Sequence, residues 1–148
     1  MDRFEILKKE YRIMLLSGLP MVGSLFVYWM LIQFVIHPPQ TPQETAAPLR
    51  YMLYFIAAGG VGAIFFLRRV LLQKKPQDNL AALIGKLKTS AMVTLAFCEA
   101  PALYGVVLYF IEGSRKDFYV LAVYSLLLFA VFFPRLDHWQ EYTAGAAE

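Results

Sequence analysis

The chain alternates between long apolar stretches and short polar segments. Four stretches carry no charged side chain, or only one: 13–36, 51–67, 89–111 and 118–134. A helix needs roughly 20 mainly apolar residues to cross a bilayer core of about 30 Å. The pattern therefore predicts four transmembrane helices, at about 13–36, 50–69, 89–111 and 118–134, with arginines at both ends of the second.

The composition agrees with a membrane protein. Of the 148 residues, 59% are hydrophobic and 17% are charged, whereas soluble domains average 45–50% apolar and about 25% charged. The single cysteine cannot form an internal disulfide. No repeat divides the sequence, so we expect an all-α, polytopic membrane protein in which residues 1–148 form a single transmembrane domain.

The distribution of Lys and Arg predicts the orientation. Eleven lie before the first span, between the second and third, or after the fourth, and only three lie in the two other loops. By the positive-inside rule this places both termini in the cytoplasm, and the inner (cell) membrane is the expected location. Basic residues at these sites face anionic headgroups, so we expect the bilayer and no nucleic acid as partner.

The segments between the spans predict local structure. The loop at 37–48 is too rich in proline for a helix. A tight turn from Glu112 to Asp117 predicts an antiparallel hairpin of the third and fourth spans. Asp78 is expected to cap a helix that is either a cytoplasmic extension of the third span, the favoured alternative, or a separate interfacial helix. The tail from Arg135 is expected to form a short amphipathic helix.

Glu99 is the one ionisable acid or base inside the four spans. A charged carboxylate at the bilayer centre costs several kcal/mol unless it is protonated, paired or hydrated, and no Lys or Arg lies at a similar depth. Removal from water therefore favours the protonated acid, and Glu99 is a candidate proton-binding site. The structural alternative is a neutral Glu99 that is hydrogen-bonded to another helix, with Ser17, Ser24, Thr94 and Ser125 as candidate partners.

Small residues surround this carboxyl along the chain. Cys98, Ala102 and Gly105 recur at helical spacing and form a stripe on which another helix can pack. Pro101 cannot donate to the helix ladder and frees a backbone acceptor beside Glu99. Span two carries small residues at a similar depth, among them Gly59, Gly60 and Gly62. We therefore expect spans two and three to touch there.

Residues 95–107, LAFCEAPALYGVV, resemble the carboxylate helix of the proteolipid (c) subunit of rotary ATP synthases. The shared pattern is a small apolar run, Glu-Ala, two residues, an aliphatic residue and Tyr-Gly. The resemblance implies that Glu99 is a proton or sodium site and that span two is the inner helix of a ring hairpin. The chain departs from that family in adding a span on each side of the matching pair.

No other pattern indicates catalysis or a cofactor. His37 and His138 are predicted at opposite membrane edges, and no Cys, His, Asp and Glu cluster has metal-ligand spacing. The sequence has neither a glycine-rich phosphate loop nor a Ser, His and Asp set. We therefore expect no metal, no cofactor and no enzyme activity. Tyr28, Trp29 and Gln33 could line a substrate path, but contacts with a neighbouring helix or the interface are the favoured interpretation.

Two functions fit these features. The first is a structural or accessory subunit of a larger membrane complex, because the loops are too small for a receptor or catalytic head. The alternative is proton-linked transport, or a c-subunit-like proton-binding protein, that uses Glu99. Other membrane subunits or copies of the same chain are the expected partners.

Overall fold

The computed structural model describes residues 3–35, 47–74 and 78–144. In this part of the chain the structure is helical and contains no β-strand. The elements are α1 (Arg3–Met30), a π-helical turn (Leu31–Val35), α2 (Ala47–Leu71), α3 (Leu80–Glu112), α4 (Arg115–Phe132) and α5 (Leu136–Thr143). Most of the predicted proline-rich loop, with His37, lies outside the described residues.

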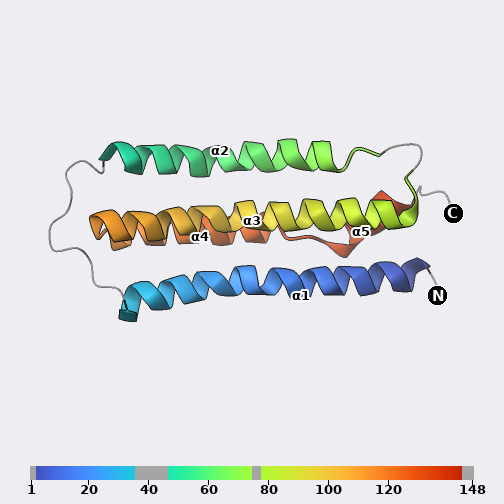
Figure 1. The fold of residues 1–148 in the computed structure, drawn as a ribbon, viewed down its shortest axis with the longest axis horizontal. Coiled ribbons are helices and arrows are strands. Elements are labelled where there is room, and N and C mark those ends of the chain that lie inside the picture. The colour runs from blue at the N-terminus through green and yellow to red at the C-terminus, as the bar shows by residue number, and fades with distance from the viewer. Residues whose placement is uncertain (1–2, 36–46, 75–77, 145–148) are drawn as a thin grey trace.

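Helix α3 is the centre of the bundle. It packs against α1, α2 and α4, and α1 and α2 flank it on opposite sides (Figure 1). Its buried residues, among them Leu83, Leu95 and Leu108, recur along its length. Helix α3 therefore carries Glu99 within the bundle.

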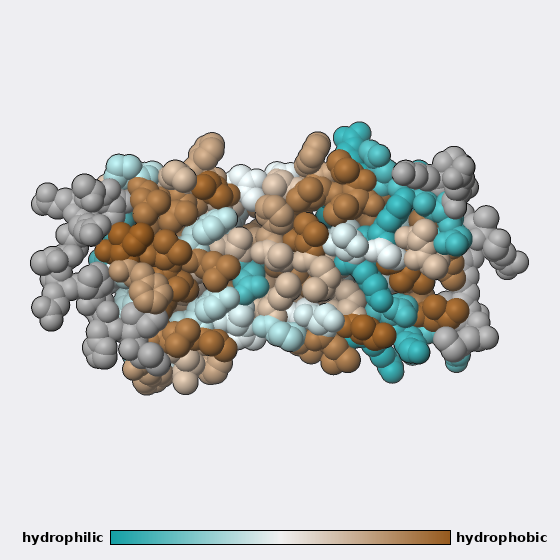
Figure 2. Space-filling model, viewed as in Figure 1, coloured by the Kyte–Doolittle hydropathy of each residue, from teal (hydrophilic) through white to brown (hydrophobic). Residues whose placement is uncertain are grey.

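The helices confirm an all-α chain with several segments able to cross a membrane. Phe4–Phe34, Ala47–Leu71 and Leu80–Glu112 are each long and apolar enough to span, and α4 with α5, bent by 44°, makes a fourth if the pair is one span. Large apolar side chains such as Phe55 and Val131 point outward. Figure 2 shows hydrophobic residues over much of the surface and hydrophilic ones gathered toward the end where α1 begins.

Helix α3 begins well before the apolar stretch. Its N-cap is Asn79, whose side chain accepts a hydrogen bond from the Ala82 N–H at 2.9 Å. The expectation that Asp78 caps this helix is wrong, because the Asp78 carboxylate instead pairs with Lys86 Nζ at 2.5 Å. The helix runs unbroken through 33 residues, about 50 Å at 1.5 Å per residue. This confirms the favoured prediction, an extension of the third span.

A tight turn joins α3 to α4, as predicted. Gly113 ends α3 with a φ of 70°, the left-handed conformation that glycine adopts without strain, and its N–H donates to Tyr109 O. Ser114 begins α4 by accepting a hydrogen bond from the Asp117 N–H. The two helices therefore form the expected antiparallel hairpin.

Helix α5 is the helix that was predicted in the tail, and it packs against α1 and α3. The Tyr11 hydroxyl donates to Pro134 O at 2.9 Å, and the Tyr11 ring packs edge-on against Trp139. The Tyr142 hydroxyl donates to Leu72 O at 2.9 Å. Trp139 is 3% exposed. These contacts hold α5 at the end of the bundle where α1 begins (Figure 1).

Candidate functional site

Glu99 faces α1 across the bundle. The Ser24 hydroxyl donates to Glu99 Oε1 at 2.5 Å, and the Tyr28 hydroxyl donates to the same oxygen at 2.6 Å. All three side chains are partly buried. The carboxyl therefore links α1 to α3 through two hydroxyl groups at one oxygen.

The local sequence of α1 explains why both hydroxyls reach Glu99. Ser24 and Tyr28 are four residues apart, so they lie one above the other on the same helix face. Two turns earlier on α1, an added Cβ at Gly18 would lie 2.8 Å from Leu95 Cδ1. The missing side chain of Gly18 lets α1 approach α3 one turn before Glu99.

The hydrogen bonds around Glu99 are compatible with either a protonated or an ionised carboxyl. Ser24 Oγ lies 2.5 Å from Glu99 Oε1 and 2.7 Å from Met21 O, but its hydroxyl has one proton to donate. With an ionised Glu99, Ser24 can donate to the carboxylate. With a proton on Oε1, Glu99 can donate to Ser24 Oγ, which then donates to Met21 O. The site can thus gain or lose a proton without leaving a hydroxyl donor unpaired.

Of the four predicted hydroxyl partners, only Ser24 bonds Glu99. Ser17 donates to Ile13 O on its own helix, and Thr94 donates to Ser90 O. The sequence reasoning missed Tyr28 as a partner, and the signal that could have found it is its spacing of four residues from Ser24.

The fourth candidate, Ser125, has a different role beside the proline. Pro101 is fully buried within α3, and α3 continues through it. The next residue, Ala102, donates its backbone N–H to Ser125 Oγ on α4 at 2.9 Å, in the buried interior. Ser125 thus joins α4 to the turn of α3 in which Pro101 lacks a backbone donor, beside Glu99.

The small-residue stripe of α3 packs against α4. Cys98 and Ala102 are fully buried. An added Cβ at Gly105 would lie 2.9 Å from Phe118 Cα and 3.3 Å from Leu121 Cβ. At Ala102 and Gly105, α4 therefore occupies part of the surface on which span two was expected.

The glycines of span two do not form the expected close contact. An added Cβ at Gly59, Gly60 or Gly62 would meet no neighbouring atom within 4 Å. Helix α2 does pack against α3, as predicted, but its buried residues are Leu53, Ala57 and Ile64. Gly59 and Gly62 are exposed, whereas Gly60 is half-buried on the face of the buried residues, where an added Cβ would still meet open space.

An ionic cluster at the end of the bundle opposite α5 was not predicted from the sequence. Arg50 on α2 pairs with Glu112 at the end of α3, and its Nη2 lies 3.2 Å from Asp117 Oδ2 on α4. The Tyr54 hydroxyl donates to Asp117 Oδ1 at 2.9 Å. The cluster joins three helices, and the sequence signal for it was Arg50 at one span end and two acids flanking the tight turn.

The described residues contain no group of three or more His, Cys, Asp and Glu side chains able to hold a metal ion. Cys98 is a buried free thiol, and His138 lies on α5. No protein-family model, curated protein or solved structure matches the chain. Its function is therefore inferred from the geometry of Glu99 and its surroundings.

Proposed function

We propose that this chain is a multi-pass protein of the inner membrane in which Glu99 binds and releases a proton as part of proton-linked transport. The observation that carries the proposal is the pair of hydroxyls, Ser24 and Tyr28, on one oxygen of the carboxyl. Hydroxyls act as donors and acceptors, so their hydrogen bonds can rearrange when the proton arrives. Ionisable groups inside transmembrane segments commonly mark ion or proton pathways.

The resemblance of residues 95–107 to the c-subunit carboxylate helix supports the same role. In that family the glutamate of the matching pattern is the ion-binding site, and Glu99 stands at its position. By this analogy the protein works as a homo-oligomer or beside other membrane subunits. The outward-facing apolar side chains of α1 and α2 offer surface for such neighbours as well as for lipid.

A second candidate is an accessory subunit in which Glu99 is structural. The contacts that favour it are the same two hydrogen bonds, because they join α1 to α3 and would stabilise the bundle with a permanently neutral carboxyl. The two candidates differ in one property, whether Glu99 exchanges its proton with the surroundings.

Carbodiimide labelling in native membranes, read by mass spectrometry across pH, tests this property. The reagent attacks a protonated carboxyl reached from an apolar phase. We expect Glu99 to react at neutral pH and its labelling to fall as pH rises. The exposed Glu141 is the internal control, because its carboxyl is open to water and is not reached from the apolar phase. Absence of Glu99 labelling at every pH would overturn the proton site and favour the accessory role.

Two substitutions separate proton binding from structural support. Glu99→Gln keeps a carbonyl oxygen for Ser24 and Tyr28 but cannot take up a proton, so assembly should persist while proton uptake by the reconstituted protein is lost. Glu99→Leu removes both the hydrogen-bond acceptor and the group that could take up a proton, and should also weaken the packing of α1 against α3. Unchanged proton uptake in Glu99→Gln would contradict the proposal.

A further inference from the structure

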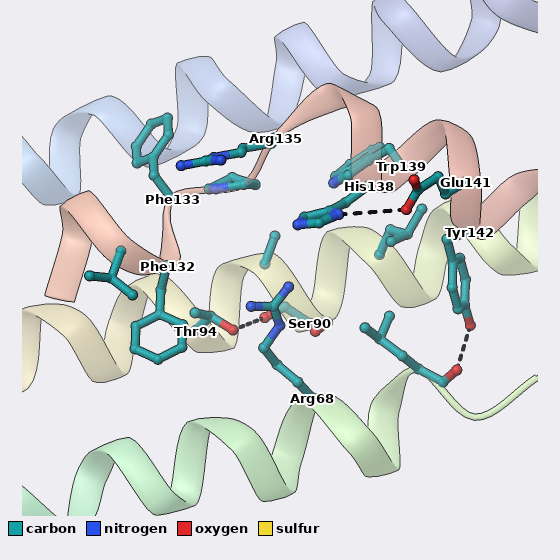
Figure 3. A pocket seen from close by; sticks show the side chains of 15 residues that line it. Arg68, Ser90, Thr94, Phe132, Phe133, Arg135, His138, Trp139, Glu141 and Tyr142 are labelled. Atoms are coloured by element: carbon teal, nitrogen blue, oxygen red, sulfur yellow. Dashed lines mark hydrogen bonds and ion pairs between the residues drawn. The ribbon is translucent and has the colours of Figure 1, made fainter.

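A cavity of about 570 Å³ lies between α5 and the adjoining parts of α2, α3 and α4, and its lining on α3 ends at Thr94, before Glu99. Its walls come from the last turns of α2, the first half of α3, the end of α4 and α5 (Figure 3). The proposed function does not use this cavity. It lies at the end of the molecule where the hydrophilic side chains gather (Figure 2).

The cavity is lined by more cationic than anionic groups. Arg68 reaches into it from α2 toward Ser90 and Thr94, while Arg135 and His138 line the side formed by α5 (Figure 3). The one carboxylate in the lining is Glu141, whose side chain is 82% exposed and lies 3.9 Å from His138. No ion pair joins Arg68 or Arg135 to a carboxylate among residues 3–35, 47–74 and 78–144.

Hydroxyl and aromatic groups complete the lining. Ser90 and Thr94 are each 4% exposed, and the Thr94 hydroxyl donates to Ser90 O at 2.7 Å. The Ser90 hydroxyl has no hydrogen-bond acceptor in the described part of the chain. Phe132 and Trp139 supply buried aromatic surface. The cavity thus combines a partly buried guanidinium and a hydroxyl donor with apolar walls.

We infer that this cavity binds a phosphate group, carried either by an anionic phospholipid or by a small water-soluble phosphate ester. The planar guanidinium of Arg68 can donate two parallel hydrogen bonds to phosphate oxygens, and Ser90 can donate a third. The basic end of the bundle is where the charge distribution predicts the anionic cytoplasmic leaflet. Phe132 and Val131 offer apolar surface to a lipid chain that leaves the cavity toward the bilayer.

Trp139 provides a direct probe, because it lines the cavity and the chain has one other tryptophan, Trp29. In a Trp29→Phe background, the protein is reconstituted in phosphatidylcholine vesicles and titrated with brominated phosphatidylglycerol. We expect quenching of Trp139 that saturates at a low fraction of phosphatidylglycerol and is weaker with brominated phosphatidylcholine. Loss of hydrogen bonds from a charged donor in Arg68→Gln should weaken apparent binding at least about tenfold.

Arg69→Gln is the matched control. Arg69 is the next residue on α2, is exposed and does not line the cavity, so the substitution removes the same charge from the same helix turn. It should leave quenching near that of the parent protein. Circular dichroism of both variants checks that the helices remain, and Arg135→Gln provides a second cavity variant if Arg68→Gln does not fold.

Water-soluble ligands distinguish the two sources of phosphate. Glycerol phosphate and inorganic phosphate are added to the protein in vesicles of phosphatidylcholine alone. An Arg68-dependent change in Trp139 fluorescence assigns the site to a soluble phosphate ester. Quenching that is selective for brominated phosphatidylglycerol, with no response to the soluble phosphates, assigns the site to a lipid headgroup. Equal quenching by both brominated lipids, unaltered in Arg68→Gln and with no response to soluble phosphate, would overturn the inference.

Discussion

The substitution Gly105→Ala tests whether α3 and α4 pack as closely as their small residues allow. The added Cβ would lie 2.9 Å from Phe118 Cα and 3.3 Å from Leu121 Cβ, and both residues are 1% exposed. Because the nearest atom is backbone, relief requires α4 to move, and overpacking of this kind costs about 1–3 kcal/mol. Alanine returns about 0.5–1 kcal/mol through its better helix propensity. We expect a net destabilisation of about 0–2.5 kcal/mol, centred near 1 kcal/mol.

Gly62→Ala is the matched control on α2. An added Cβ there meets open space, so the same chemical change should be neutral or stabilise by about 0.5–1 kcal/mol. Both variants are purified in mild detergent and unfolded by increasing fractions of denaturing detergent, with helix content followed by circular dichroism. If Gly105→Ala unfolds at the same detergent fraction as Gly62→Ala, or at a higher one, the close packing at Gly105 is refuted.

Two further substitutions address polar contacts between helices. Ser125→Ala removes the acceptor of the Ala102 N–H in the buried interior and should cost about 1–3 kcal/mol in the same unfolding assay; an unchanged midpoint would show that the N–H finds another acceptor. Arg50→Gln leaves Glu112, whose side chain is 6% exposed, without its cation and should cost about 3 kcal/mol near neutral pH. Arg115→Gln, at an exposed position on α4, should shift stability by no more than about 0.5 kcal/mol in the same assay.

The lengths of the helices and their connections were largely predictable from sequence. Charge-free stretches near 20 residues indicate spans regardless of how they pack, and Gly113 with Ser114 marked the turn between α3 and α4. The cap of α3 was misassigned because Asp78 and Asn79 both suit that position. The choice was made by a tertiary contact, the pairing of Asp78 with Lys86, which no local pattern encodes.

The rotation of each helix about its axis was much less predictable. An amphipathic helix of a soluble protein shows its inward face as an apolar stripe, but a span that is apolar all round carries no such stripe. This is why Gly59, Gly60 and Gly62 were assigned to a close contact with α3, although an added Cβ at each of them would meet open space. The same lack of a stripe hid Tyr28, whose hydroxyl faces Glu99 only at one rotation of α1.

The few polar groups in the spans therefore indicate how each helix is rotated about its axis, which the apolar residues do not. A hydroxyl buried in lipid without a partner costs free energy, so Ser24 and Tyr28 favour the one rotation of α1 that brings both to Glu99. Structural support and proton binding then use the same contacts, and they are not exclusive. In the proposed function, both hydroxyls can still donate to an ionised Glu99, so proton release need not detach α1 from α3. A carboxyl held in this way can change its charge while the helices around it keep their positions.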